Sequence, residues 1–225
     1  MSSAGKNIHN LAKKLWPLNR SLSGNGVRES FQIIKKIIPE LRIHEVSSGK
    51  KVFDWNIPKE WNVKEAWIKT PSGKKICDFS VNNLHLLGYS IPVHRKLTLV
   101  ELQKKLYTHE IDKAIPYRTS YYNEDWGFCL SKNEFNSLEE GLYEVFIDSS
   151  LENGNLHYAD LIIKGKSEKE ILISSYCCHP QQCNDSLSGT VVAMHLAKYL
   201  LNTENYYSYR FVFIPETIGA ITYIS

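Results

Sequence analysis

Residues 170–176 read Glu-Ile-Leu-Ile-Ser-Ser-Tyr, an apolar run that is typical of a strand buried on both faces of a parallel sheet. Residues 209–214, Tyr-Arg-Phe-Val-Phe-Ile, form a second such run. A helix is predicted between them, over about 187–202, with these residues facing inward: Val191, Val192, Leu196, Tyr199 and Leu200. Strand, helix and strand at this spacing predict a βαβ unit with parallel strands. We therefore expect an α/β fold with a mainly parallel sheet and helices on both faces.

The N-terminal segment predicts further elements of the same domain. Apolar residues recur at helical spacing in residues 7–17 and 26–38, and Pro17 and Pro39 end these two helices. Residues 41–46 alternate like a half-buried strand.

The middle of the chain has a different texture. Residues 51–154 consist of short alternating runs that are interrupted by prolines and rich in Tyr, Trp and Phe, which indicates a mostly β module. We therefore expect a discontinuous α/β domain, residues 1–50 and 155–225, with this module inserted. One βαβ unit is too little sheet for such a domain, so we expect it to be incomplete at the C-terminus.

Composition excludes several classes of protein. The net charge of +3 is too mild to indicate nucleic-acid binding, and no run approaches the roughly 18 apolar residues that span a membrane. The first residues lack the apolar segment of a signal peptide. Five cysteines, two of them adjacent, do not resemble a disulfide framework, so we expect reduced thiols and a cytoplasmic protein.

Three polar residues follow the predicted strands. His179 comes after the first strand, Asp185 precedes the helix, and Glu216 follows the second strand. Ligands of open α/β sheets bind beyond the carboxyl ends of the strands, where all three can converge. Imidazole and carboxylate groups suit zinc, and a further carboxylate can act as general base toward a water that the metal activates.

Each of the three residues also has an ordinary structural interpretation. Asp185 resembles a helix N-cap, which also lies at the positive end of the helix dipole. A lone histidine at a strand end is commonly a hydrogen-bonded structural residue, and a glutamate after a strand is commonly a solvated loop residue. The case for a metal site therefore depends on the combination.

Two motifs around these residues resemble the zinc aminopeptidase-like hydrolases. Residues 174–180, Ser-Ser-Tyr-Cys-Cys-His-Pro, precede Asn-Asp-Ser-Leu-Ser-Gly at 184–189, which is similar to a family turn whose Asp bridges two metals. Residues 213–219, Phe-Ile-Pro-Glu-Thr-Ile-Gly, resemble the motif in which a strand runs into Glu-Glu-x-Gly. Asn-Arg-Ser-Leu-Ser-Gly at 19–24 and the aromatic-rich middle resemble a bacterial branch with an inserted domain of unknown function.

This resemblance implies an aminopeptidase that hydrolyses N-terminal peptide bonds of a peptide or aminoacyl substrate. His179 would bind one zinc, Asp185 would bridge two, and Glu216 would be the general base. Thr217 stands where the family has a second glutamate, so one ion is an alternative to two. The family's later Asp and His ligands would lie beyond Ser225, so we expect these 225 residues alone to be inactive.

Three other interpretations are open. A structural zinc site could use Cys177, Cys178, His179 and Cys183, and a cysteine protease could use Cys178 with His179, but neighbouring residues on a strand point to opposite faces. A non-catalytic binding protein on the same scaffold could recognise a peptide or sugar through Tyr121, Tyr122 and Trp126. Those aromatic residues could equally form the core of the β module.

Overall fold

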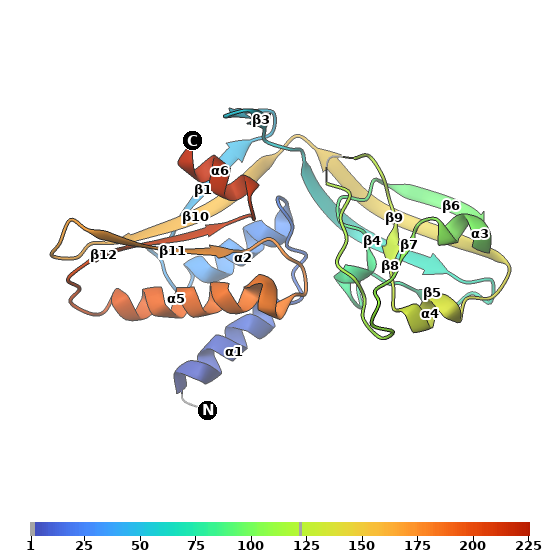
Figure 1. Ribbon diagram of the computed structural model, residues 1–225, viewed down its shortest axis with the longest axis horizontal. Helices are drawn as coiled ribbons and strands as arrows, with labels where there is room; N and C mark the ends of the chain where they lie inside the picture. The colour runs from blue at the N-terminus through green and yellow to red at the C-terminus, as the bar shows by residue number, and fades with distance from the viewer. Residues whose placement is uncertain (1–2, 122) are drawn as a thin grey trace. The chain divides into compact units, whose positions relative to one another are not determined.

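The computed structural model describes residues 3–121 and 123–225, and the chain forms two units (Figure 1). Unit 1 contains the chain up to Glu60 and from Asn153 onward, and unit 2 contains Trp61–Glu152. The chain leaves unit 1 later than the change of texture at residue 51 suggests. The reason is a small antiparallel pair, β2 (Lys51–Val52) and β3 (Trp55–Asn56), which belongs to unit 1.

Unit 1 is built on one four-stranded sheet. Its strands lie in the order β1 (Arg42–Ser47), β10 (Asn155–Ile163), β12 (Ser208–Ile214) and β11 (Glu170–Tyr176). β11 and β12 are parallel, whereas β10 is antiparallel to both β1 and β12. The prediction of a mainly parallel sheet is therefore wrong, because β10 does not stand out in the sequence. Its alternation is obscured by two buried polar residues, His157 and Asp160.

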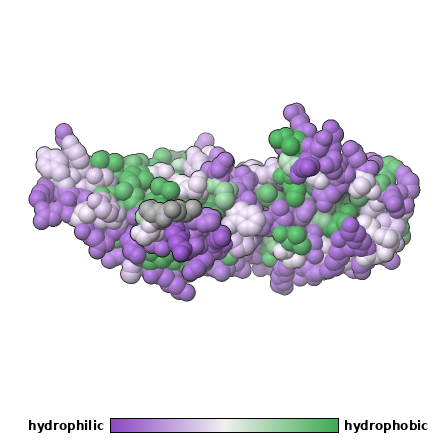
Figure 2. Space-filling view, turned by 90° about the horizontal axis from the view of Figure 1, so that it is seen from below, coloured by the Kyte–Doolittle hydropathy of each residue, from purple (hydrophilic) through white to green (hydrophobic). Residues whose placement is uncertain are grey.

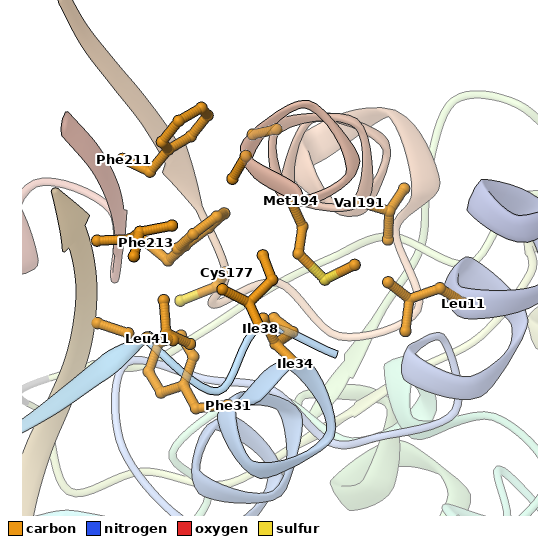
Figure 3. Packing of buried hydrophobic residues seen from close by; sticks show 14 of the residues in the cluster. Leu11, Phe31, Ile34, Ile38, Leu41, Cys177, Val191, Met194, Phe211 and Phe213 are labelled. Carbon is orange, nitrogen blue, oxygen red and sulfur yellow. The ribbon is translucent and has the colours of Figure 1, made fainter. Parts of the chain in front are cut away.

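Helices cover both faces of this sheet, as predicted. α1 (Ser3–Leu15), α2 (Asn25–Lys35) and α5 (Ser188–Leu200) lie on one face, and α6 (Ile218–Ile224) lies on the other (Figure 1). The helices predicted at 7–17, 26–38 and 187–202 are confirmed with shifted ends. Their apolar faces pack on β10 and β12 in one buried cluster (Figure 3), which includes Leu11, Phe31, Ile34, Ile38, Met194, Phe211 and Phe213.

The loop between α1 and α2 is tightly packed. Arg20, Ser21, Leu22 and Ser23 are all buried. The chain enters α2 through Gly24, whose φ of 112° lies in the left-handed region that favours glycine. Gly26, in the first turn of α2, lies so close to the loop that a Cβ there would clash with the backbone carbonyl of Asn19. The loop therefore has little freedom to move relative to α2.

Two predictions of burial in unit 1 are wrong. β11 is the last strand of the sheet, and its side chains are largely exposed, with Leu172 62% accessible. On α5, Val191 and Leu200 are buried as expected, but an adjoining stripe of Val192, Leu196 and Tyr199 is exposed. Figure 2, seen from the side of α1 and α5, shows hydrophobic side chains gathered on this part of the surface. The apolar pattern therefore predicts the strand β11 and the helix α5 correctly. It does not predict which of their side chains are buried.

Unit 2 contains a four-stranded sheet in the order β5 (Lys75–Ile76), β4 (Glu60–Lys69), β9 (Leu142–Glu152) and β6 (Val93–Thr98). β4 pairs with β5, and β6 with β9, in antiparallel fashion. A small parallel pair, β7 (Leu106–Tyr107) and β8 (Phe128–Cys129), adds a second sheet. Two short helices, α3 (Leu99–Gln103) and α4 (Lys132–Asn136), begin with capping boxes at Thr98 and Ser131, and a 3₁₀ turn spans Asn83–His85.

Among residues 3–121 and 123–225, no helix is long and apolar enough to cross a membrane. The five cysteines are free thiols, and only Cys183 is exposed. Free thiols are what the number and spacing of the cysteines predict.

We predict that Gly26→Ala destabilises the protein. Alanine in a helix normally stabilises it by about 0.5–1 kcal/mol relative to glycine. Here the added Cβ meets the Asn19 carbonyl, so we expect a loss of about 1–3 kcal/mol, measured as a lower urea midpoint. Glu29→Ala, at an exposed position of the same helix, is the control and should change stability by less than about 0.5 kcal/mol. A stabilised Gly26→Ala variant would contradict this packing.

We also predict that the exposed edge of unit 1 promotes self-association. An apolar edge strand offers unpaired backbone groups and apolar side chains to another chain. Leu172→Lys should lower the sedimentation coefficient measured at high protein concentration without lowering the unfolding temperature. The matched control is Val81→Lys, at an exposed apolar residue of unit 2, which should leave association unchanged. Equal association of the wild type and Leu172→Lys would contradict the prediction.

Candidate metal site

The parallel pair β11 and β12 positions two of the three predicted site residues. Tyr176, the last residue of β11, lies opposite Ile214, the last residue of β12. The pairing extends one residue further, because the Cys177 N–H donates to the Ile214 carbonyl at 3.0 Å. His179 and Glu216 follow these strand ends directly, so both lie at the same edge of the sheet.

Asp185 is positioned by the segment that leads into α5. It lies in a single π-helical turn, Cys183–Leu187, and its own backbone is extended, with φ −117° and ψ 93°. The peptide bond that follows it, Asp185–Ser186, is cis. The hydroxyls of Ser186 and Thr190 donate to the Tyr176 carbonyl at 2.7 and 2.6 Å. These two bonds attach the turn to the end of β11, and this places Asp185 beside His179.

Glu216 is held by its backbone. Its N–H donates to the Sγ of Cys178 at 3.1 Å. The turn that follows is tight, because a Cβ on Gly219 would crowd Pro215. Thr217, at the position of the family's second glutamate, has φ 56° and directly precedes α6.

The three side chains converge around the imidazole of His179. Its Nε2 lies 3.2 Å from Glu216 Oε2, and its Nδ1 lies 3.6 Å from Asp185 Oδ1. His179 is 5% exposed, whereas the side chains of Asp185 and Glu216 are 62% and 42% exposed. A buried ring therefore stands between two carboxylates that reach solvent. The structure brings together all three residues that the sequence singled out.

This donor set suits part of a zinc site. Zinc takes imidazole nitrogen at about 2.0–2.1 Å and carboxylate oxygen at about 2.0–2.2 Å in tetrahedral geometry. Two such ligands of one ion lie a little over 3 Å apart, close to the 3.6 Å between Nδ1 and Oδ1. In the described part of the chain, no three His, Cys, Asp or Glu side chains form a complete metal-binding group. His179 and Asp185 have the donor atoms that zinc prefers, and the described residues contain no metal-binding group.

The neighbouring thiols do not form an alternative centre. Cys177 packs in the core of unit 1 (Figure 3), while Cys178 points toward Glu216, so the two face apart as expected. The Sγ of Cys178 does approach His179 Nδ1, at 3.9 Å. Burial raises the pKa of the Cys178 thiol to about 12, so it is protonated at neutral pH and is a poor nucleophile. Cys183 is exposed.

Two residues that support the site were missed in the sequence. Cys178 holds Glu216, as described above. Arg20 is only 2% exposed, and its Nη2 donates to the backbone carbonyl of His179 at 2.9 Å. Burial lowers the pKa of Arg20 to about 10, which still leaves the guanidinium charged at neutral pH. The motif at 19–24 was the only available signal, and it gave Arg20 no role.

Tyr121 and Trp126, the two described residues of the proposed aromatic surface, are not exposed. Trp126 is buried, with the ammonium of Lys105 5.6 Å from its ring centre. Tyr121 is half-buried and its ring lies 6.1 Å from that of buried Tyr89, while Tyr122 lies outside the described residues. The interpretation of Tyr121 and Trp126 as packing residues is therefore favoured over a recognition surface.

The remaining histidines do not extend the site. Hydrogen bonds within the protein occupy six of the other seven: His44, His85, His94, His109, His157 and His195. The seventh, His9, is exposed on α1. His195 also lines a cavity of about 750 Å³ beside α1 and α5, which contains none of the three site residues.

Similar proteins are known from Clostridium acetobutylicum. A Clostridium acetobutylicum protein named "Putative polysaccharide biosynthesis protein with aminopeptidase-like domain" is 52% identical over 225 residues, which are 100% of this chain and 52% of the relative. A crystal structure described as a "putative peptidase" from the same organism has a TM-score of 0.94 at 52% identity, over 98% of this chain and 52% of that one. The chain thus spans about half the length of these two relatives.

More distant structures share the fold. A zinc aminopeptidase from Bacillus subtilis has a TM-score of 0.61 at 14% identity, covering 98% of this chain and 63% of that one. A peptidase M28 precursor from Shewanella amazonensis has a TM-score of 0.57 at 13% identity, covering 98% and 70%. These likenesses show a peptidase-like fold.

The family model described as "Domain of unknown function (DUF4910)" matches residues 9–225. Because this match spans nearly the whole chain, the chain belongs to the DUF4910 family.

Proposed function

We propose that this chain contributes to the active site of a zinc-dependent aminopeptidase. The observation that carries the proposal is the His179 ring between the carboxylates of Asp185 and Glu216, at the carboxyl end of a parallel strand pair. Aminopeptidase-like relatives and neighbours of the same fold support it.

His179 and Asp185 are the proposed zinc ligands. Zinc, when bound, polarises the scissile carbonyl and lowers the pKa of the attacking water. Whether one or two ions bind depends on Thr217, since a neutral hydroxyl is a poor zinc ligand. Cys178 holds the Glu216 backbone, because its Sγ accepts the Glu216 N–H.

Glu216 is the proposed general base. Its carboxylate is partly exposed to solvent and lies 3.2 Å from Nε2 of His179, the ring nitrogen that does not face Asp185. It takes a proton from the attacking water and passes it to the amine that leaves when the peptide bond breaks. The proposed substrate is a peptide or aminoacyl compound whose first carbonyl lies beside His179.

A non-catalytic binding protein is less well supported than an enzyme. That interpretation rests on Thr217, which stands where the family has a ligand glutamate, and on an exposed aromatic surface, and Trp126 of that surface is buried.

We predict that the chain binds zinc through His179 and Asp185. With zinc in excess at neutral pH, the zinc bound per chain at equilibrium is separated from free zinc by ultrafiltration and measured by elemental mass spectrometry. Asp185→Ala should lose most of the bound zinc, because it removes one of two ligands, whereas Glu216→Gln should retain it. Glu29→Gln, at an exposed acid away from the site, controls for the change in charge. Equal zinc in the wild type and Asp185→Ala, or none in either, would overturn the proposed site.

We predict, second, that catalysis needs more ligands than these residues supply. The 225-residue chain should not cleave an aminoacyl p-nitroanilide above background, because two protein ligands hold zinc weakly. In a longer form, of the length of the relatives, Glu216→Gln should keep its zinc and lower kcat about 10²–10⁴-fold, the usual contribution of a general base. An unchanged kcat in that variant would exclude Glu216 as the base. Zinc-dependent turnover by the 225-residue chain would refute the need for further ligands.

A further inference from the structure

The proposed function leaves the motif Asn-Arg-Ser-Leu-Ser-Gly at 19–24 without a role, although it is one of the most buried polar segments of unit 1. Gly24 and Gly26 hold the motif against the first turn of α2, as described above. Arg20, within this constrained loop, has its charged group in the interior of the unit. Because this loop is constrained, the side chain of Arg20 can hold a neighbouring segment in a fixed position.

Arg20 joins two backbone carbonyls. One arm of its guanidinium, Nη1, donates to the carbonyl of Leu15 at the end of α1. The other arm, Nη2, donates to the carbonyl of His179 at 2.9 Å, 159 positions away in the sequence. The planar fork of arginine suits this task, because it offers two donors in a fixed relative orientation.

A second bond connects the same N-terminal segment to the same loop. Trp16 directly follows α1, and its Nε1 donates to the carbonyl of Gln181 at 3.2 Å. Gln181 has φ 43°, in the left-handed region that few non-glycine residues adopt. β11 ends at Tyr176, so pairing in the sheet does not by itself fix the backbone of residues 179–181. Trp16 and Arg20 contact this stretch on both sides of Pro180.

Stability alone does not account for a buried arginine at this place. In the described part of the chain, no carboxylate forms an ion pair with Arg20. A buried charge without an opposite charge is costly, and well-packed apolar side chains often replace such groups with no loss of stability. The two carbonyls that Arg20 contacts are therefore the best explanation for its presence.

We propose that Arg20 is a positioning residue that holds the backbone of His179 so that its imidazole stays between Asp185 and Glu216. The inference rests on the proposed function, because the value of this position is to present a ligand to zinc. Groups that orient a metal ligand typically change metal affinity about 10–100-fold when they are removed.

The test compares zinc affinity among variants of the 225-residue chain. Arg20→Met keeps most of the apolar stem and removes both donors, and Arg20→Lys keeps the charge but offers a single donor point. The matched control is Arg28→Met, which removes a part-buried arginine of unit 1 that pairs with Glu60, away from His179. Dissociation constants come from competition with a chromogenic zinc chelator at neutral pH, below the unfolding temperature of every variant.

We expect Arg20→Met to weaken zinc binding at least about tenfold, Arg20→Lys to weaken it less, and Arg28→Met to leave it unchanged. The visible spectrum of the cobalt-substituted chain should shift in Arg20→Met and not in Arg28→Met, because it reports ligand geometry rather than stability. Trp16→Phe, a change at an exposed side chain, should also weaken binding, and it keeps the inference testable if Arg20→Met does not fold.

The outcomes separate this inference from the proposed function. If the wild type binds no zinc, the proposed function fails, and the inference fails with it. If the wild type binds zinc through Asp185 and Arg20→Met binds it equally tightly with an unchanged cobalt spectrum, only the role of Arg20 is overturned. An equal loss in Arg28→Met would also overturn it, because the effect would then be one of general stability.

Discussion

The candidate site depends on the parallel pairing of β11 with β12. Residues 176 and 214 end their strands opposite each other, so the residues that follow both strands emerge at one edge. An antiparallel pair would send His179 and Glu216 to opposite ends of the sheet. The turn containing Asp185 is attached to the same edge through the Tyr176 carbonyl, so this one strand end orients two of the three side chains.

Much of unit 1 could be predicted from sequence because apolar periodicity reports an element directly. The helices α1, α2 and α5 and the strands β11 and β12 all show it. β10 does not, because it buries His157 and Asp160, which bond to neighbouring polar groups. A period of two cannot distinguish a paired buried polar residue from an exposed one. Since β10 lies between β1 and β12, missing it also hid the antiparallel character of the sheet.

Burial was predicted less well than the elements themselves. The apolar residues of β11 and of the outer stripe of α5 predict buried side chains, yet Leu172 and Leu196 are accessible to solvent. Periodicity reports that a face is apolar, and it does not report which neighbour covers that face. The order of strands decides this, and strand order arises from contacts between residues far apart in sequence.

The site shows the same division between chemistry and support. His179, Asp185 and Glu216 are recognisable because their side chains carry the chemistry and follow strand ends. Arg20 contacts the backbone carbonyl of His179, and Cys178 contacts the backbone N–H of Glu216. Every residue type has a backbone carbonyl, so the identity of the contacted residue gives no sign of its partner. Nothing in residues 177–185 therefore indicates that an arginine near the N-terminus is required. The sequence signal is local to residues 19–26, where Gly24 and Gly26 follow the arginine closely. The structure adds that this arginine is buried and that no carboxylate of the described chain pairs with it. A buried arginine without an ion-pair partner, in a loop that glycines constrain, is a pattern by which positioning residues can be sought in other proteins.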